Sequence, residues 1–117
     1  MKSVLVIDDD PSLVRLIALV LKTHGFDVIE ASNGLEALEV LNERVPSAII
    51  VDLQMPFMDG RTFFKEIDGP GRPPTIIVSA YGAEKARREL GAEACLDKPF
   101  DPSALVEQIA KLTSDNY

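Results

Sequence analysis

Five polar residues follow short apolar segments and could share one site: Asp8, Asp9, Asp52, Ser79 and Lys98. Carboxylates crowded together repel one another unless a cation is present, and an all-oxygen cluster with few protein ligands suits Mg²⁺. A carboxylate that attacks phosphorus forms an aspartyl phosphate. A cation, an ammonium and a hydroxyl around that group would stabilise its three phosphoryl oxygens. These residues therefore predict a phosphoryl-accepting site on Asp52, with Asp9 and Asp52 as direct ligands of the metal.

The elements that must position these residues alternate between strands and helices. Apolar runs without polar alternation, of which 48–51 is the clearest, indicate strands buried on both faces. Expected strands cover 4–7, 26–31, 48–51, 75–78 and 94–96. Because five strands alternate with five helices, we expect an α/β fold: a doubly wound, five-stranded parallel sheet with helices on both faces. The strand ends that carry the polar residues then meet at one edge of the sheet.

Capping residues and apolar spacing place the helices. Asp10-Pro11 and Asp101-Pro102 each combine an N-cap with a proline at the first helical position, and Asn33 is a third N-cap. The other two helices follow residue 60 and span 84–90. The apolar faces of the first two helices are expected to comprise Leu13, Leu16, Ile17, Val20 and Leu21, and Leu35, Leu38, Leu41 and Val45.

Length and charge limit the class of protein. The 117 residues, 46% of them hydrophobic, fit one domain over 1–117, with a core at about 3–112 and a polar tail at 113–117. A net charge of −7 argues against direct binding of nucleic acid by this domain. There is no glycine-rich phosphate loop, so the phosphoryl donor must be another molecule or protein rather than bound ATP.

Cysteine content and hydropathy bear on the compartment. Cys95 is the one cysteine, which excludes an internal disulfide framework and fits a reducing compartment. We expect its side chain to be a small buried hydrophobic group. No apolar run is long enough to cross a bilayer and no signal-peptide pattern begins the chain, so we expect a cytoplasmic location without membrane contact.

Several motifs recur together in one known family. They are Ile7-Asp8-Asp9-Asp10, Asp52 followed by Met55-Pro56 and Met58-Asp59-Gly60, Ser79-Ala80, and Lys98-Pro99-Phe100. With these motifs, the sequence resembles the receiver domain of bacterial two-component response regulators, the CheY-like superfamily, over about 4–112. The resemblance implies a flavodoxin-like (βα)5 fold with strand order 2-1-3-4-5.

The resemblance also implies a role for each site residue. Asp52 would be the phosphoacceptor, and Ser79 and Lys98 would contact the phosphoryl group. Mg²⁺ would be held by Asp9, Asp52 and the backbone carbonyl of Gln54, with Asp8 acting through water. The Lys98-Pro99 peptide would be cis.

The implied function is a signalling switch rather than a turnover enzyme, since such a domain catalyses only its own phosphorylation and dephosphorylation. The donor would be a phosphohistidine on a sensor histidine kinase or a histidine phosphotransfer protein. The phosphorylated domain would act on a downstream effector protein or a fused output domain. An aspartate-nucleophile phosphatase is a weak alternative, because Gln54 stands where such enzymes carry a second aspartate as general acid.

Two features depart from the family pattern. Cys95 holds the place of the aromatic residue that normally reports phosphorylation, and the spacing from Ser79 to Lys98 is about one helical turn short. We therefore expect an atypical readout, an altered fourth helix, and no formation of the family's common activated dimer. A pseudo-receiver, which binds partners without being regulated by phosphorylation, stays as the alternative.

Overall fold

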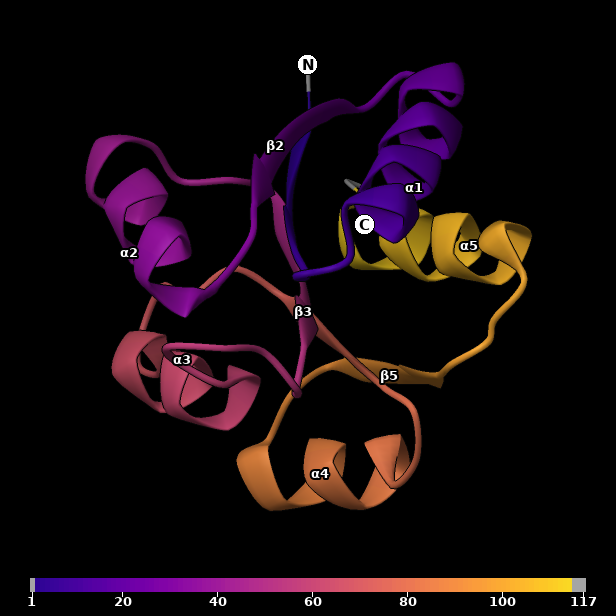
Figure 1. Cartoon of the computed structure of the whole chain (residues 1–117). Helices are drawn as coiled ribbons and strands as arrows, with labels where there is room; N and C mark the ends of the chain where they lie inside the picture. The colour runs from indigo at the N-terminus through magenta and orange to yellow at the C-terminus, as the bar shows by residue number, and fades with distance from the viewer. Residues whose placement is uncertain (1, 115–117) are drawn as a thin grey trace.

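The computed structural model describes residues 2–114, and in them five strands and five helices alternate (Figure 1). Residues 1 and 115–117, including most of the expected tail, lie outside the described residues. The elements are β1 (Ser3–Ile7), α1 (Pro11–Thr23), β2 (Asp27–Ala31), α2 (Gly34–Glu43), β3 (Ala48–Asp52), α3 (Gly60–Ile67), β4 (Thr75–Ser79), α4 (Ala83–Leu90), β5 (Ala94–Asp97) and α5 (Pro102–Leu112).

The strands form one parallel sheet in the order β2-β1-β3-β4-β5, which confirms the predicted flavodoxin-like topology. Helices α1 and α5 cover one face of the sheet, and α2, α3 and α4 cover the other (Figure 1). In the register of the sheet, Ile7 lies opposite Ala31 and Val51, and Asp52 lies opposite Val78. The residues that follow β1 and β3 are therefore brought to the same edge.

The core consists of two apolar layers, one on each face of the sheet. Successive strand residues point to opposite faces, so Val4 and Val6 join the layer under α1 and α5, whereas Leu5 and Ile7 join the other. Every residue of β1, β3 and β4 is buried, as expected for central strands of a doubly wound sheet. This burial gives the strand ends a rigid base.

The predicted helix faces are partly wrong. Leu16 is 46% exposed and Leu35 is 50% exposed, because each helix covers the sheet with a narrower stripe than the apolar spacing suggests. Val45 is 76% exposed and lies beyond α2, which ends at Glu43. Arg44 is already extended there, and the proline after Val45 disfavours helical geometry for Val45 itself.

The predicted helix starts are confirmed. Asp10 caps α1 by accepting hydrogen bonds from the backbone N–H groups of Ser12 and Leu13, at 3.0 and 3.4 Å. Asp101 caps α5 through Ser103 N at 2.9 Å. Such caps satisfy N–H groups that have no partner within the helix. The Lys98-Pro99 peptide is cis, as the family resemblance implied.

Candidate functional site

Two buried carboxylates and one ammonium form the centre of the candidate site. Asp8, directly after β1, is 4% exposed, and Asp52, at the end of β3, is 3% exposed. Lys98, directly after β5, places its Nζ 2.9 Å from Asp8 Oδ2 and 3.3 Å from Asp52 Oδ2. The fold thus brings together three residues whose positions in the sequence span most of the chain.

A third carboxylate, Asp9, completes a group that fits a divalent cation. Carboxylate oxygens of Asp8, Asp9 and Asp52 lie within 4.8 Å of one another, and Asp9 is exposed to solvent. Mg²⁺ prefers a few carboxylate oxygens and keeps several of its waters, so a half-open, all-oxygen group of this kind suits it. The arrangement is an acidic cluster that fits Mg²⁺.

The local electrostatics leave the site short of positive charge. Burial raises the pKa of Asp52 above its ordinary value, and the neighbouring Asp8 charge adds to this, while Lys98 and the Gln54 N–H oppose it. Burial alone would lower the pKa of Lys98, but its hydrogen bond to Asp8 and the two carboxylate charges leave that pKa raised. One ammonium therefore compensates two buried acids, and a bound cation would further reduce the repulsion between these carboxylates.

Backbone contacts fix the position of Asp52. The N–H of Gln54 donates to Asp52 Oδ1 at 3.3 Å, so the Gln54 peptide lies beside the carboxylate while its side chain is exposed. Gly60 N donates to Leu53 O at 3.0 Å, which brings the start of α3 against the strand end. A Cβ at Gly60 would lie 2.3 Å from the Asp52 carbonyl oxygen, so only glycine fits.

Ser79 lies at the same edge, but its hydroxyl is turned to its own loop. The side chain is buried, and Oγ donates to the Tyr81 carbonyl at 2.8 Å. The Ser79 carbonyl accepts a hydrogen bond from Lys98 N at 2.7 Å, which joins the ends of β4 and β5. The structure therefore places Ser79 beside the site with its hydroxyl bound elsewhere.

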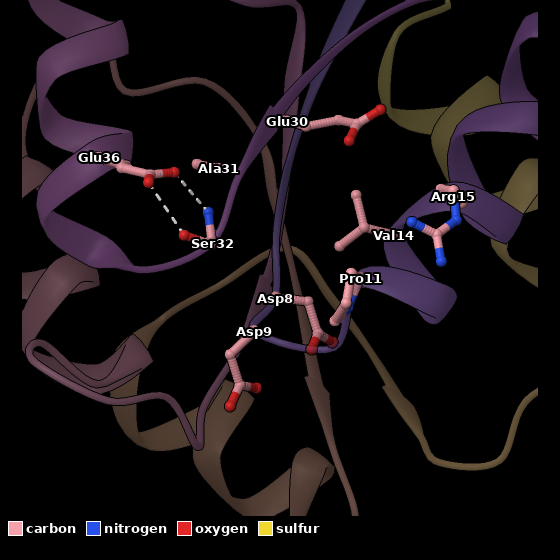
Figure 2. Close-up of a pocket in the computed structure, with 9 residues that line it drawn as sticks. All are labelled: Asp8, Asp9, Pro11, Val14, Arg15, Glu30, Ala31, Ser32 and Glu36. Atoms are coloured by element: carbon pink, nitrogen blue, oxygen red, sulfur yellow. Dashed lines mark hydrogen bonds between the residues drawn. The ribbon is translucent and has the colours of Figure 1, made fainter.

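A hollow of about 300 Å³ opens next to Asp8 and Asp9 (Figure 2). Arg15 of α1 and Glu30 of β2 line it, and neither was predicted from the sequence, because a single charged residue on a helix or edge strand gives no distinctive pattern. Figure 2 shows the Glu36 carboxylate bound to Ser32, at 2.8 Å from its N–H and 3.0 Å from its hydroxyl. Glu36 is thus held apart from the acidic cluster.

A second, apolar groove of about 450 Å³ is lined in part by Lys98. It runs between α1 and the loop from β5 to α5, and its walls are mainly Leu13, Leu16, Ile17, Pro99, Phe100 and Pro102. The helical spacing of Leu16 predicted a core position for it, and the groove was not predicted. The signal in the sequence that could have indicated it is the pair of closely spaced prolines, Pro99 and Pro102, with Phe100 between them.

Cys95 differs from the expectation of a buried hydrophobic side chain. It is only partly buried where it packs against the apolar layer under α2, α3 and α4, and its thiol donates to Glu84 Oε2 of α4 at 3.1 Å. Burial and the Glu84 hydrogen bond raise the pKa of Cys95 to about 11. The hydrogen bond from Arg87, and next that from Cys95, lower the pKa of Glu84 to about 2. The expectation failed because β5 is an edge strand whose α4 face stays partly open to solvent.

Comparisons with known proteins give the same family throughout. A profile described as response regulator receiver domain matches residues 4–110. The chain is 39% identical over 112 residues to the transcriptional regulatory protein CpxR homolog of Haemophilus influenzae, covering 93% of this chain and 49% of that protein. It is 40% identical over 110 residues to the transcriptional regulatory protein GlrR of Escherichia coli, covering 90% and 24%. The chain thus spans about half, or less, of the length of these relatives.

Solved structures share the fold. The receiver domain of the Francisella response regulator 1452 matches with a TM-score of 0.89 and 30% identity, covering 97% of both chains. A response regulator receiver protein from Burkholderia phymatum matches with a TM-score of 0.87 and 29% identity, covering 97% of this chain and 95% of that one. No helix within residues 2–114 combines the length and apolarity that a membrane crossing requires.

Proposed function

Because the chain belongs to the response regulator receiver domain family of two-component signalling, we propose that Asp52 accepts a phosphoryl group from a phosphohistidine. The donor would be a sensor histidine kinase or a histidine phosphotransfer protein. One observation carries the proposal: Lys98 Nζ lies within 3.3 Å of the Asp8 and Asp52 carboxylates, and Asp9 adds a third carboxylate to the same cluster. Such a receiver is a signalling module rather than a turnover enzyme.

The proposed reaction is an in-line displacement at phosphorus. An oxygen of the Asp52 carboxylate attacks, forming an O–P bond, and the bond between phosphorus and the donor imidazole nitrogen breaks. The electron pair of that bond stays on the imidazole, which leaves the site. Lys98 is placed to stabilise the charge that develops on the phosphoryl oxygens, because its ammonium already lies against Asp52. Hydrolysis of the acyl phosphate would reset the domain.

The carboxylates fit a bound Mg²⁺. Asp9, Asp52 and the backbone carbonyl of Gln54 would hold the ion, and Asp8 would act through water. When bound, Mg²⁺ supplies charge neutralisation between the acids and the incoming phosphoryl oxygens. The exposure of Asp9 leaves the cluster open to solvent, as a site that exchanges ion and waters needs.

Ser79 would take part after rearrangement. Its hydroxyl now donates to the Tyr81 carbonyl, and we propose that it turns to a phosphoryl oxygen once Asp52 is modified. The loop after β4 would move with it and alter the surface around α4. Cys95 stands in the place of the usual aromatic residue. The structural change caused by phosphorylation would therefore have to reach α4 through other residues.

The partner surfaces follow from the position of the site. The apolar groove beside Lys98 could bind a helix that presents a phosphohistidine to Asp52.

The domain over 1–117 would act in the cytoplasm on an effector protein or on a fused output domain. The named relatives are transcriptional regulators of more than twice the matched length, which supports a fused output.

The absence of the common activated dimer stays a prediction. Measuring the oligomeric state of the protein with beryllofluoride bound would check it.

Intact-mass spectrometry after incubation with acetyl phosphate and Mg²⁺ tests the proposed function. We expect one added phosphoryl group on the parent protein, none without Mg²⁺, and none on Asp52→Asn. If no adduct forms, binding of beryllofluoride with Mg²⁺ distinguishes rapid hydrolysis from absence of the chemistry. Failure of both would favour the pseudo-receiver, which binds partners without phosphorylation.

A further inference from the structure

Strand β5 holds the first turn of α4 with two side chains. Cys95 and Asp97 are two residues apart in the strand and therefore point to the same face, the one that α4 covers. The Cys95 thiol donates to Glu84, and the Asp97 carboxylate accepts a hydrogen bond from Ala83 N at 3.2 Å. Both contacts fall on the first two residues of α4.

The contact from Asp97 substitutes for a missing cap. The residue before α4 is Gly82, which has a φ of 73° and no side chain to accept a hydrogen bond. The first N–H groups of a helix have no partner within it, and a carboxylate near them is also favoured by the helix dipole. Asp97 therefore caps α4 from a neighbouring strand, which no local sequence signal predicts.

Lys98, the residue directly after β5, also holds the beginning of the loop that leads to α4. The Ser79 carbonyl accepts a hydrogen bond from Lys98 N at 2.7 Å, and Asp97 binds Ala83 at the other end of this loop. Between these two points the Ser79 hydroxyl donates to the Tyr81 carbonyl. The adjacent residues Asp97 and Lys98 thus hold both ends of the five-residue segment 79–83.

We propose that Asp97 is a positioning residue that opposes the turning of Ser79 toward a phosphoryl group on Asp52. Its hydrogen bond to Ala83 restrains the loop in the arrangement in which the Ser79 hydroxyl is bound to Tyr81. Movement of Ser79 to the phosphoryl group displaces Tyr81 and breaks the contact with Ala83. This inference rests on the proposed function, and it links the site to α4 without an aromatic residue in β5.

Titration of Mg²⁺ and beryllofluoride, followed by amide NMR of the whole chain, tests the inference. Asp97→Ala should bind beryllofluoride about fivefold more tightly than the parent, the factor that corresponds to a typical capping interaction. Its affinity for Mg²⁺ alone should not change, because Asp97 is not part of the acidic cluster. Asp97→Asn keeps an acceptor oxygen for Ala83 and should behave like the parent.

Asp101→Ala is the matched control. It removes the same charge and one capping contact, from α5 instead of α4, and should leave the affinity for beryllofluoride unchanged. In the parent protein, the Ala83 amide should exchange with solvent faster once beryllofluoride is bound, a measurement that needs no variant. If the parent and Asp97→Ala bind beryllofluoride with equal affinity, or if the Ala83 amide stays protected, the inference is overturned but the proposed function is not. A parent that binds no beryllofluoride would overturn the proposed function and the inference with it.

Discussion

Lys98 Nζ lies 2.9 Å from Asp8 Oδ2, although the two residues are 90 positions apart in the chain. The same ammonium is 3.3 Å from Asp52, so one cation compensates two carboxylates that are almost completely buried. Burying a charge without a partner costs several kcal/mol, whereas a paired charge costs far less. The pair therefore links the stability of the protein to the state of its candidate site.

Replacing Lys98 with alanine should lower the free energy of unfolding by about 3 kcal/mol at pH 7, because two buried carboxylates then face each other without a cation. Addition of Mg²⁺ should restore part of the loss, since the ion binds the folded protein. Urea unfolding with and without Mg²⁺ measures both effects. A variant as stable as the parent in metal-free buffer would show that the ammonium does not compensate these acids.

Replacing Asp52 with asparagine should stabilise the metal-free protein at neutral pH. The pKa of Asp52 in the folded protein is raised above its ordinary 3.8, so its ionised form opposes folding. That penalty grows as the pH rises through the window that begins near 3.8. We expect Asp52→Asn to be more stable by about 1 kcal/mol at pH 7.

The difference between Asp52→Asn and the parent should shrink as the pH falls below the ordinary pKa of 3.8, because the carboxyl group then becomes protonated in both the folded and the unfolded chain. Urea midpoints measured from pH 3 to pH 7 give the pH profile. A difference that stays constant over this range would contradict the raised pKa as its cause.

Cys95 should react slowly with thiol reagents despite its partial exposure. Its pKa of about 11 leaves little thiolate at pH 8, whereas a free cysteine titrates near 8.5. Reaction with Ellman's reagent should therefore be roughly 100-fold slower than for a small thiol. Glu84→Gln removes the neighbouring negative charge and should speed the reaction. Equal rates for the parent and this variant would rule out the Glu84 contact as a cause.

Replacing Gly60 with alanine should destabilise the protein by about 2 kcal/mol, because the new Cβ would meet the backbone of Asp52 and Leu53, which cannot move freely. Gly34→Ala is the matched comparison. Its Cβ would meet the side chain of Met58, at 2.9 Å, and a flexible methionine can shift. Thermal unfolding should show the larger loss for Gly60→Ala, and the opposite order would contradict this account.

Much of the architecture could be predicted from local sequence. Apolar runs located the strands of the sheet, and Asp10 and Asp101 marked helix starts, because strand burial and N-capping depend on neighbouring residues. Helix faces were harder to predict. Leu16, Leu35 and Val45 have apolar side chains at helical spacing, yet the width of the buried stripe depends on how the helix packs against the sheet.

The order of the elements and the meeting of Asp8, Asp52 and Lys98 at one edge could be predicted from the sequence, because parallel strands end at a common edge. Three features could be seen only in the folded domain: how these groups pair, where the Ser79 hydroxyl points, and that Asp97 caps α4. These contacts join segments far apart in the chain or depend on a side-chain rotamer. They are set by the packing of the whole domain, which local sequence patterns do not contain.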